Sequence, residues 1–370
     1  MPTFCRHNRF IERCPICSRT LPGAEAATSA ARRRQSARGG AGAARGSTSP
    51  AHRHRRLLAG GKGVRVHREL RAQDDGYRSD LAPGLHSSQD AARLAEEIAF
   101  ASGRLLGLHA APPDLFGEIR ELAVEGELER ATWMCFLTVY LSPLQGDDPF
   151  AGVRIALERD GGQWAAREGD GEDGGGEDVS HRPEDVFHGG ERVPYGEEGV
   201  PSLDGIPLGP RTSHDPARGS QTLLAYRHWV SQFGSQAQAF TGEDSWTPRR
   251  RFERVYERLA FPGLWRQGRY ELLVTLGRLR LYELDADSLH LTGADPEDET
   301  AIAAKRVLAV GEPVYLERRA VAFAQELSVG IDVLDLAFAN WGAGERATLG
   351  FPPDTVDQHA LERAREALEL

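Results

Sequence analysis

Three of the four cysteines lie close together near the N-terminus, at a spacing that suits a metal ion. Cys5, Cys14 and Cys17 form the pattern C-x-H-x6-C-x2-C with His7. Zinc binds four thiolate or imidazole ligands in a tetrahedral arrangement, and a Cys-x-x-Cys turn supplies two of them. We therefore expect a structural zinc site with His7 as its fourth ligand. The alternative is a set of incidental or redox thiols, although the strand and helix that flank a redox Cys-x-x-Cys are missing from the pattern.

A second candidate for chemistry is an acid near the C-terminus. Pro352 and Pro353 precede Asp357 and predict a helix start that places this carboxylate in the first turn. The backbone N–H groups and the dipole of a helix N-terminus favour an ionised carboxylate. Such a group, facing a pocket, could stabilise positive charge on a sugar or activate a water, with His359 orienting a phosphate or the water. The alternative is that Asp357 only stabilises its helix, by about 0.3–1 kcal/mol, and that His359 is solvated.

The residues around Asp357 also resemble a known sequence element. Val356 to His359, with Arg363 one turn later, is similar to the V-D-T-H-V-x-R element of the helix–hairpin–helix DNA glycosylase superfamily, in which the aspartate is catalytic. Leu141 to Gln145 is similar to the L-S-x-Q element of the same enzymes. The order of elements over about residues 85–370 resembles in particular the alpha-glutamyl/putrescinyl thymine pyrophosphorylase family. Those proteins are glycosylase-derived and associated with hypermodified bases in phage DNA, and relatives are implicated in phage defence.

Several other polar or aromatic side chains are candidates for contact with DNA. By the resemblance, Arg363 and Gln145 belong to elements that bind DNA or enter a base pocket. Lys305 and Arg306 could contact phosphates, and Trp341 could stack on a base. Each has a structural alternative, as a solvated helix face, a helix-terminal residue or a core residue. The hairpin consensus L-P-G-V-G is absent and no lysine stands at a recognisable hairpin position, which favours a monofunctional enzyme.

Charge is distributed unevenly along the chain. The 370 residues carry a net charge of −10, yet residues 1–72 hold 16 Lys and Arg against 3 Asp and Glu. A basic arm favours contact with a polyanion, although a solvated tail has the same composition. No apolar run approaches the roughly 18 residues that cross a bilayer. The start Met1–Cys5 lacks the apolar core of a signal peptide, so we expect a cytoplasmic protein.

The pattern of elements divides the chain into three parts. Residues 1–20 are the expected zinc-binding segment, and residues 21–72, which lack apolar periodicity, are expected to be a disordered basic linker. Residues 73–370 are expected to form a helical, glycosylase-like domain with a loop insertion at about 160–219. The fold class is therefore all-α, with a small N-terminal zinc-knuckle segment. Helices are expected at about 88–109, after 113, at 128–141, 149–158, 221–240, 247–260, 268–284, 297–309, 313–327, 331–341 and 353–368.

Three functions fit these observations. The first is a monofunctional DNA glycosylase that flips out a modified base, such as a phage hypermodified base, and leaves an abasic site, in phage defence. The second is a base-modifying transferase of the thymine pyrophosphorylase type, because a fold does not dictate its chemistry. The third is a non-catalytic adaptor that binds nucleic acid through the zinc segment and the arginine-rich arm. The expected partner is DNA, with no membrane and no protein partner. Extensive DNA contact also predicts a positive groove lined by Arg249, Arg250, Arg251, Lys305, Arg306, Arg318 and Arg319.

Overall fold

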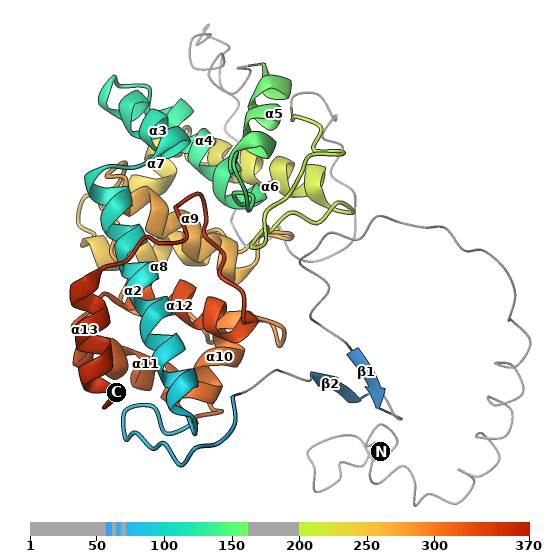
Figure 1. Ribbon diagram of the computed structural model, residues 1–370. Coiled ribbons are helices and arrows are strands. Elements are labelled where there is room, and N and C mark those ends of the chain that lie inside the picture. The colour runs from blue at the N-terminus through green and yellow to red at the C-terminus, as the bar shows by residue number, and fades with distance from the viewer. Residues whose placement is uncertain (1–56, 61–63, 68–71, 162–199) are drawn as a thin grey trace, which may run out of the picture. The chain divides into compact units, whose positions relative to one another are not determined.

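The computed structural model describes residues 57–60, 64–67, 72–161 and 200–370 (Figure 1). The chain divides into two compact units, Met1–Arg68 and Glu69–Leu370. Each unit is described by itself below.

The described part of the first unit is a two-stranded hairpin. Strands β1 (Leu57–Gly60) and β2 (Val64–His67) pair antiparallel, with Leu58 opposite Val66. The hairpin lies inside residues 21–72, for which the absence of helical periodicity predicts no regular structure. Two short runs of β-branched or apolar residues on either side of a glycine-rich stretch are typical of a β-hairpin. Each run has only four residues, which is too few to show the alternation of apolar and polar residues by which a strand is recognised.

The second unit is built from helices, which confirms the predicted all-α body. The helices are α2 (Ser88–Ala110), α3 (Asp114–Val124), α4 (Leu128–Leu141), α5 (Ala151–Asp160), α6 (Gly219–Ser231), α7 (Gln236–Thr241), α8 (Pro248–Arg258), α9 (Arg266–Arg278), α10 (Glu299–Val307), α11 (Pro313–Glu326), α12 (Ile331–Ala343) and α13 (Gln358–Ala367). In the part of the chain that the structure describes, none of them is both long enough and apolar enough to cross a bilayer.

Three helices, α2, α4 and α12, run through the core. α4 and α12 bury nearly all of their residues, as expected of helices that are apolar all round. α2 packs against α12 and α13, while α4 packs against α3 and α9. Figure 1 shows α2 running from the group of α10 to α13 towards the group of α3 to α7, so it connects both halves of the unit.

One predicted helix is interrupted. The segment 221–240 reads as a single helix, but α6 ends at Ser231 and α7 begins at Gln236. Gly234, between them, has a φ of +87°, a left-handed conformation that glycine adopts without a steric penalty. The hydroxyl of Ser235 then caps α7 by accepting a backbone N–H.

The segment before α6 forms hydrogen bonds with the C-terminal end of α4. Residues 200–218 run without a helix. The Ser213 N–H donates to the carbonyl of Tyr140 at 3.0 Å, which satisfies one of the unpaired carbonyls at the helix end. The backbone N–H of Arg211 donates to the Ser142 hydroxyl at 3.3 Å. This capping places Arg211 beside the end of α4.

Candidate functional site

Asp357 is the N-cap of α13 and not a residue of its first turn. Its Oδ1 accepts the N–H of Ala360 at 3.2 Å, and its Oδ2 accepts the Ser102 hydroxyl at 2.7 Å. Its own N–H donates to the carbonyl of Ala99 at 3.0 Å. The helix starts later than the predicted residue 353 because these contacts fix Asp357 against α2. Both carboxylate oxygens therefore already hold α13 in place.

The environment of Asp357 keeps its carboxyl ionised. Partial burial raises its pKa, but the Ser102 hydrogen bond, the helix N–H groups and the charge of Arg363 together lower the pKa below 3.8. His359 is exposed, and its backbone N–H is among the groups that stabilise the carboxylate. The predicted ionised acid at a helix start is thus present, and its catalytic role stays a prediction.

Arg363 and Trp341 make contacts inside the protein. The Nε of Arg363 donates to the carbonyl of Leu327 at 3.1 Å, which ties α13 to the end of α11. Trp341 is buried, and its indole N–H donates to the carbonyl of Asp90 at 2.9 Å. The structure therefore places Trp341 in the core between α2 and α12, with no exposed face for stacking on a base.

The remaining predicted DNA-contacting residues lie on other elements. Gln145 is exposed just after α4, and its side-chain oxygen accepts the Thr348 hydroxyl at 3.2 Å. Lys305 and Arg306 occupy the last turn of α10, where Lys305 is exposed. The structure does not gather these side chains and Asp357 around one cavity.

The predicted positive groove cannot include Arg251. This side chain is buried and donates to the carbonyls of Thr241 at 2.7 Å and Glu283 at 2.9 Å. Its neighbour Arg249 pairs with Asp285 at 3.2 Å. Arg251 holds two loops together, so the prediction that it lines an exposed groove is wrong.

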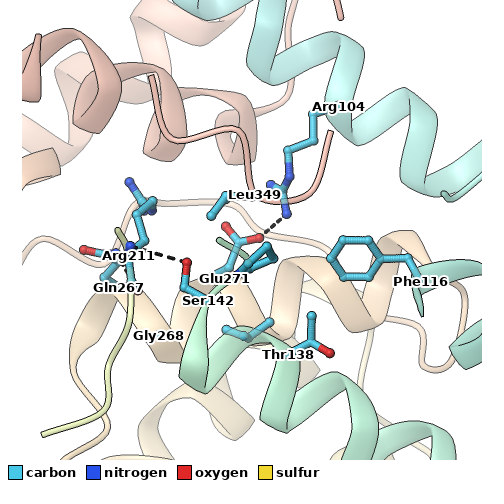
Figure 2. Close-up of a pocket in the computed structure, with 11 residues that line it drawn as sticks. Arg104, Phe116, Thr138, Ser142, Arg211, Gln267, Gly268, Glu271 and Leu349 are labelled. Carbon is cyan, nitrogen blue, oxygen red and sulfur yellow. Dashed lines mark hydrogen bonds and ion pairs between the residues drawn. The ribbon is translucent and has the colours of Figure 1, made fainter. Parts of the chain in front are cut away.

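A small cavity lies where α2, α3, α4 and α9 meet (Figure 2). Its free volume for the centre of a water molecule is about 10 Å³, room for about one water. The walls combine apolar and polar side chains. They are Arg104, Phe116, Thr138, Val139, Ser142, Pro143, Arg211, Gln267, Gly268, Glu271 and Leu349.

Two buried arginines line this cavity, and each uses one end of its guanidinium group on a carboxylate. Arg104 of α2 is 2% exposed and donates through Nη2 to Glu271 of α9. Arg211 is 6% exposed and donates through Nη2 to Asp335 at 2.7 Å. The Nε of Arg104 and the Nε and Nη1 of Arg211 are buried and have no hydrogen-bond partner among the residues that the structure describes. A buried unsatisfied donor costs about 1–3 kcal/mol, so these N–H groups suit a ligand with acceptor atoms.

Glu271 lies between the two arginines in Figure 2. Its Oε1 accepts from Arg104 and from the Thr275 hydroxyl, the latter at 3.1 Å. Its Oε2 accepts no hydrogen bond from the described residues. The cavity thus offers an acceptor with a donor on either side.

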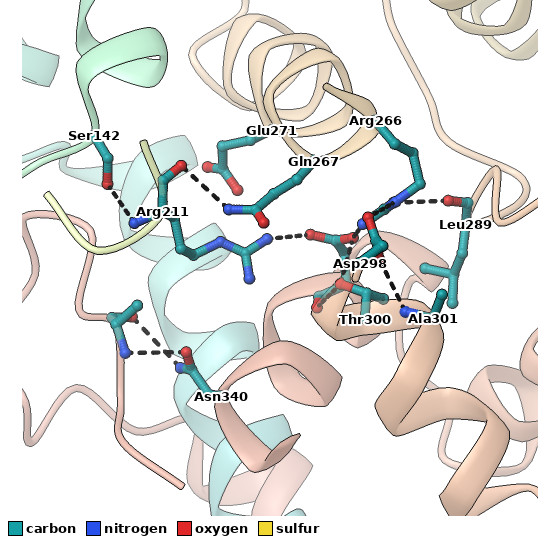
Figure 3. Close-up of polar contacts among 12 residues, drawn as sticks. Ser142, Arg211, Arg266, Gln267, Glu271, Leu289, Asp298, Thr300, Ala301 and Asn340 are labelled. Carbon is teal, nitrogen blue, oxygen red and sulfur yellow. Dashed lines mark hydrogen bonds and ion pairs between the residues drawn. The ribbon is translucent and has the colours of Figure 1, made fainter. Parts of the chain in front are cut away.

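Asp335 of α12 is hydrogen-bonded to Arg211 and Arg266, the two arginines labelled in Figure 3. Its Oδ2 accepts from Arg211 at 2.7 Å, and its Oδ1 accepts from Arg266 at 2.6 Å and from Thr300 at 3.1 Å. Arg266 also pairs with Asp298 at 2.7 Å. Burial raises the pKa of Asp335, but the charges of Arg266 and Arg211 lower it more, so the carboxyl is ionised.

Sequence reasoning missed this cavity except for Ser142, which stands in the element similar to L-S-x-Q. Ser142 has a φ of +60°, a conformation that costs a non-glycine residue energy and is often found at functional sites. Arg104 and Glu271 each interrupt a mostly apolar stretch of helix. A charge on the buried face of a helix is the signal that could have identified them, because such a charge needs a partner.

The predicted zinc ligands Cys5, His7, Cys14 and Cys17 lie outside the described residues, so zinc binding stays a prediction. Within residues 72–161 and 200–370, no three His, Cys, Asp or Glu side chains gather in a way that could hold a metal ion.

Comparison with known proteins gives one family match, which covers part of the helical unit. No curated protein and no solved structure matches the chain. Residues 212–348 match the family alpha-glutamyl/putrescinyl thymine pyrophosphorylase clade 3, which confirms the predicted resemblance. The match includes Glu271 on the α9 wall of the cavity and ends before Asp357. Over residues 212–348, this chain is therefore similar to the alpha-glutamyl/putrescinyl thymine pyrophosphorylase family.

Proposed function

We propose that this chain is an enzyme that modifies thymine-type bases in DNA, and that the reaction takes place at the cavity lined by Arg104, Arg211 and Glu271. The observation that carries the proposal is that the family match includes the wall of α9, where Glu271 presents a free carboxylate oxygen beside buried, unpartnered N–H groups. A pocket that combines apolar walls with a few converging polar groups is the usual setting of an active site.

The family name joins a thymine base, an α-glutamyl or putrescinyl group, and pyrophosphate. One reaction connects all three. The methyl carbon is the only saturated carbon of thymine, so it is the position that can carry a pyrophosphate ester. The amine nitrogen of glutamate or putrescine forms a C–N bond to this carbon, the C–O bond to pyrophosphate breaks, and pyrophosphate and one proton are released. The enzyme would take the base out of the DNA stack and hold it for this attack.

The test uses duplex DNA whose thymine methyl carbons carry pyrophosphate, incubated with the full chain and either glutamate or putrescine. We expect release of pyrophosphate together with a new amine-bearing nucleoside detected by mass spectrometry. Arg211→Met, which removes the cavity donors, should lower the rate by about tenfold or more. Arg249→Met, on the exposed face of α8, is the matched control. A folded wild-type chain that releases no pyrophosphate with either amine would exclude the proposal.

Base excision is the second candidate function. It is favoured by the ionised carboxylate of Asp357 at the start of α13, which could support positive charge on the sugar. DNA with normal and modified bases would be incubated with the chain and scored for abasic sites. Asn caps a helix about as well as Asp, so Asp357→Asn removes the charge while keeping the cap. Abasic sites that appear with the wild type and disappear with Asp357→Asn would support excision, whereas their absence on every DNA would exclude it.

A further inference from the structure

The buried ionic cluster around the cavity is electrically neutral. Three guanidinium groups are matched by three carboxylates. The guanidinium groups are those of Arg104, Arg211 and Arg266, and the carboxylates are those of Glu271, Asp298 and Asp335. A polyanion bound to the cluster itself would bring uncompensated charge into this buried region, which is costly, so we expect the cluster to hold the uncharged ring of the substrate and not its pyrophosphate group. An uncharged group with acceptor oxygens would satisfy the spare N–H groups without that cost.

The donors and the acceptor that line the cavity are complementary to the pairing edge of thymine or uracil. Arg211 and Arg104, which have spare N–H groups, and Glu271, which has a free Oε2, all line the cavity, and Figure 2 shows Glu271 between the two arginines. The pairing edge of thymine or uracil presents an acceptor, a donor and an acceptor, namely O4, N3–H and O2. The two sets of groups are complementary. Cytosine presents an unprotonated N3, whose lone pair would meet the Glu271 carboxylate and be repelled.

The apolar walls suit the faces of the ring. Phe116 of α3, Val139 of α4 and Leu349 of the loop between α12 and α13 line the same cavity. A pyrimidine ring has apolar faces and polar edges, and enzymes that act on flipped bases hold the faces between apolar side chains while hydrogen bonds read the pairing edge.

We infer that this cavity reads the pairing edge of a thymine-type base, with Arg104 and Arg211 donating to its carbonyl oxygens and Glu271 accepting its N3–H. Glu271 therefore rejects cytosine at N3, and the arginine N–H that faces O4 of thymine rejects the N4 amino group of cytosine, because two donors would face each other. The inference rests on the proposed function for the class of substrate, and it assigns the residues that select the base.

The cavity must widen to admit a ring, because its present volume holds about one water. Among the residues that line the cavity, Leu349 is the best suited to move. It has a φ of +51°, in the left-handed region that costs a leucine energy, and Gly350 beside it has a φ of +87°. Leu349→Ala should enlarge the cavity and strengthen base binding several-fold.

Binding can be measured without any reaction, by ligand-observed NMR titration of the full chain with free bases methylated at N1 in place of the sugar. We expect 1-methylthymine to bind and 1-methylcytosine to bind at least about tenfold more weakly, because its binding leaves buried polar groups unpaired. The sharpest control is 1,3-dimethylthymine, which keeps both carbonyl oxygens and carries a methyl group in place of the N3–H. It should bind as weakly as 1-methylcytosine.

Glu271→Gln tests the assigned residue. The glutamine amide can donate to N3 of cytosine, so the preference for 1-methylthymine over 1-methylcytosine should fall several-fold, and the remaining preference comes from the arginine N–H that faces the cytosine amino group. Glu253→Gln, an exposed glutamate of α8, should keep the wild-type preference. Thermal unfolding of each variant establishes that it is folded, and Leu349→Ala provides a second test that leaves the ionic contacts intact.

Three results would overturn the inference. They are equal binding of 1-methylthymine and 1,3-dimethylthymine, an unchanged base preference in folded Glu271→Gln, and no binding of 1-methylthymine to either the wild type or Leu349→Ala. The proposed function fails separately. If the chain converts the base in DNA but does not bind free bases selectively, the proposed function stands and the inference fails. If it binds free bases selectively but converts no DNA, the inference stands and the proposed function fails.

Discussion

At the scale of single residues, the Asp335 carboxylate joins two of the three buried arginines near the cavity. It is 2% exposed and accepts from both Arg211 and Arg266. Removing one partner of a buried ion pair leaves an uncompensated charge and costs about 3–5 kcal/mol. Asp335→Asn should therefore lower the free energy of unfolding by about that amount, measured by urea denaturation. Asp285→Asn, which removes the exposed partner of Arg249, should change it little; equal effects of the two substitutions would contradict this view of the cluster.

His290 is the second residue with a measurable consequence for stability. Burial, together with the charges of Arg266 and Arg269, lowers its pKa to about 4. The folded protein keeps this ring neutral, whereas the unfolded chain binds a proton near pH 6.5. The stability that His290 contributes is thus complete above pH 6.5 and is lost as the pH falls towards 4, by on the order of 2–3 kcal/mol.

His290→Asn tests this pH dependence. The φ of His290 is +52°, a conformation that asparagine tolerates, and asparagine does not titrate. Urea unfolding at a series of pH values between 7 and 4 should show a shallower loss of stability for the variant than for the wild type. Parallel curves for the two proteins would show that His290 does not titrate differently in the folded and unfolded states.

The residues of the cavity illustrate what sequence reasoning can find. Asp357 was predictable as an ionised acid at a helix start, because prolines and helix dipoles act locally. Arg104, Arg211 and Glu271 stand in three separate segments with no shared motif. Their convergence depends on how α2, α9 and the end of α4 pack, which no local pattern encodes.

At the scale of elements, the packing of α13 on α2 depends on Gly103. A Cβ at this position would lie 2.9 Å from the backbone nitrogen of Asp357, closer than real Cβ contacts allow. Gly103→Ala should force the helices apart and lower the free energy of unfolding by about 1–3 kcal/mol, measured by thermal unfolding. Gly311→Ala is the control, since its Cβ would meet no atom within 4 Å. A Gly103→Ala protein as stable as the control would mean that α13 adjusts freely.

Most helices were predictable because apolar periodicity, prolines and glycines act within one element. The expected helix at 128–141 coincides with α4, and the expected start at residue 313 coincides with that of α11. The predictions failed where a contact between elements decides the boundary. The start of α13 is delayed to Gln358 because Asp357 is bonded to Ser102 and Ala99 of α2.

At the scale of the whole molecule, the N-terminal cysteines carry a prediction of their own. We expect one zinc ion per chain, measured by elemental analysis of the purified protein, and its loss in Cys14→Ser, since a four-ligand structural site rarely keeps its metal with three ligands. His7→Asn examines the fourth ligand separately. A wild-type chain without bound zinc after purification in zinc-containing medium would refute the site, and full zinc content in His7→Asn would assign the fourth ligand elsewhere.

The two candidate sites of the molecule, the cavity beside Glu271 and the acid Asp357, make opposite predictions for one experiment. The wild type, Glu271→Gln and Asp357→Asn would each be incubated with amine and DNA bearing pyrophosphorylated thymine, and the digested nucleosides would be quantified by mass spectrometry. We predict that the wild type and Asp357→Asn form the amine-bearing nucleoside while Glu271→Gln forms about tenfold less or none. Loss of product in Asp357→Asn with full activity in Glu271→Gln would contradict the assignment of the cavity as the active site.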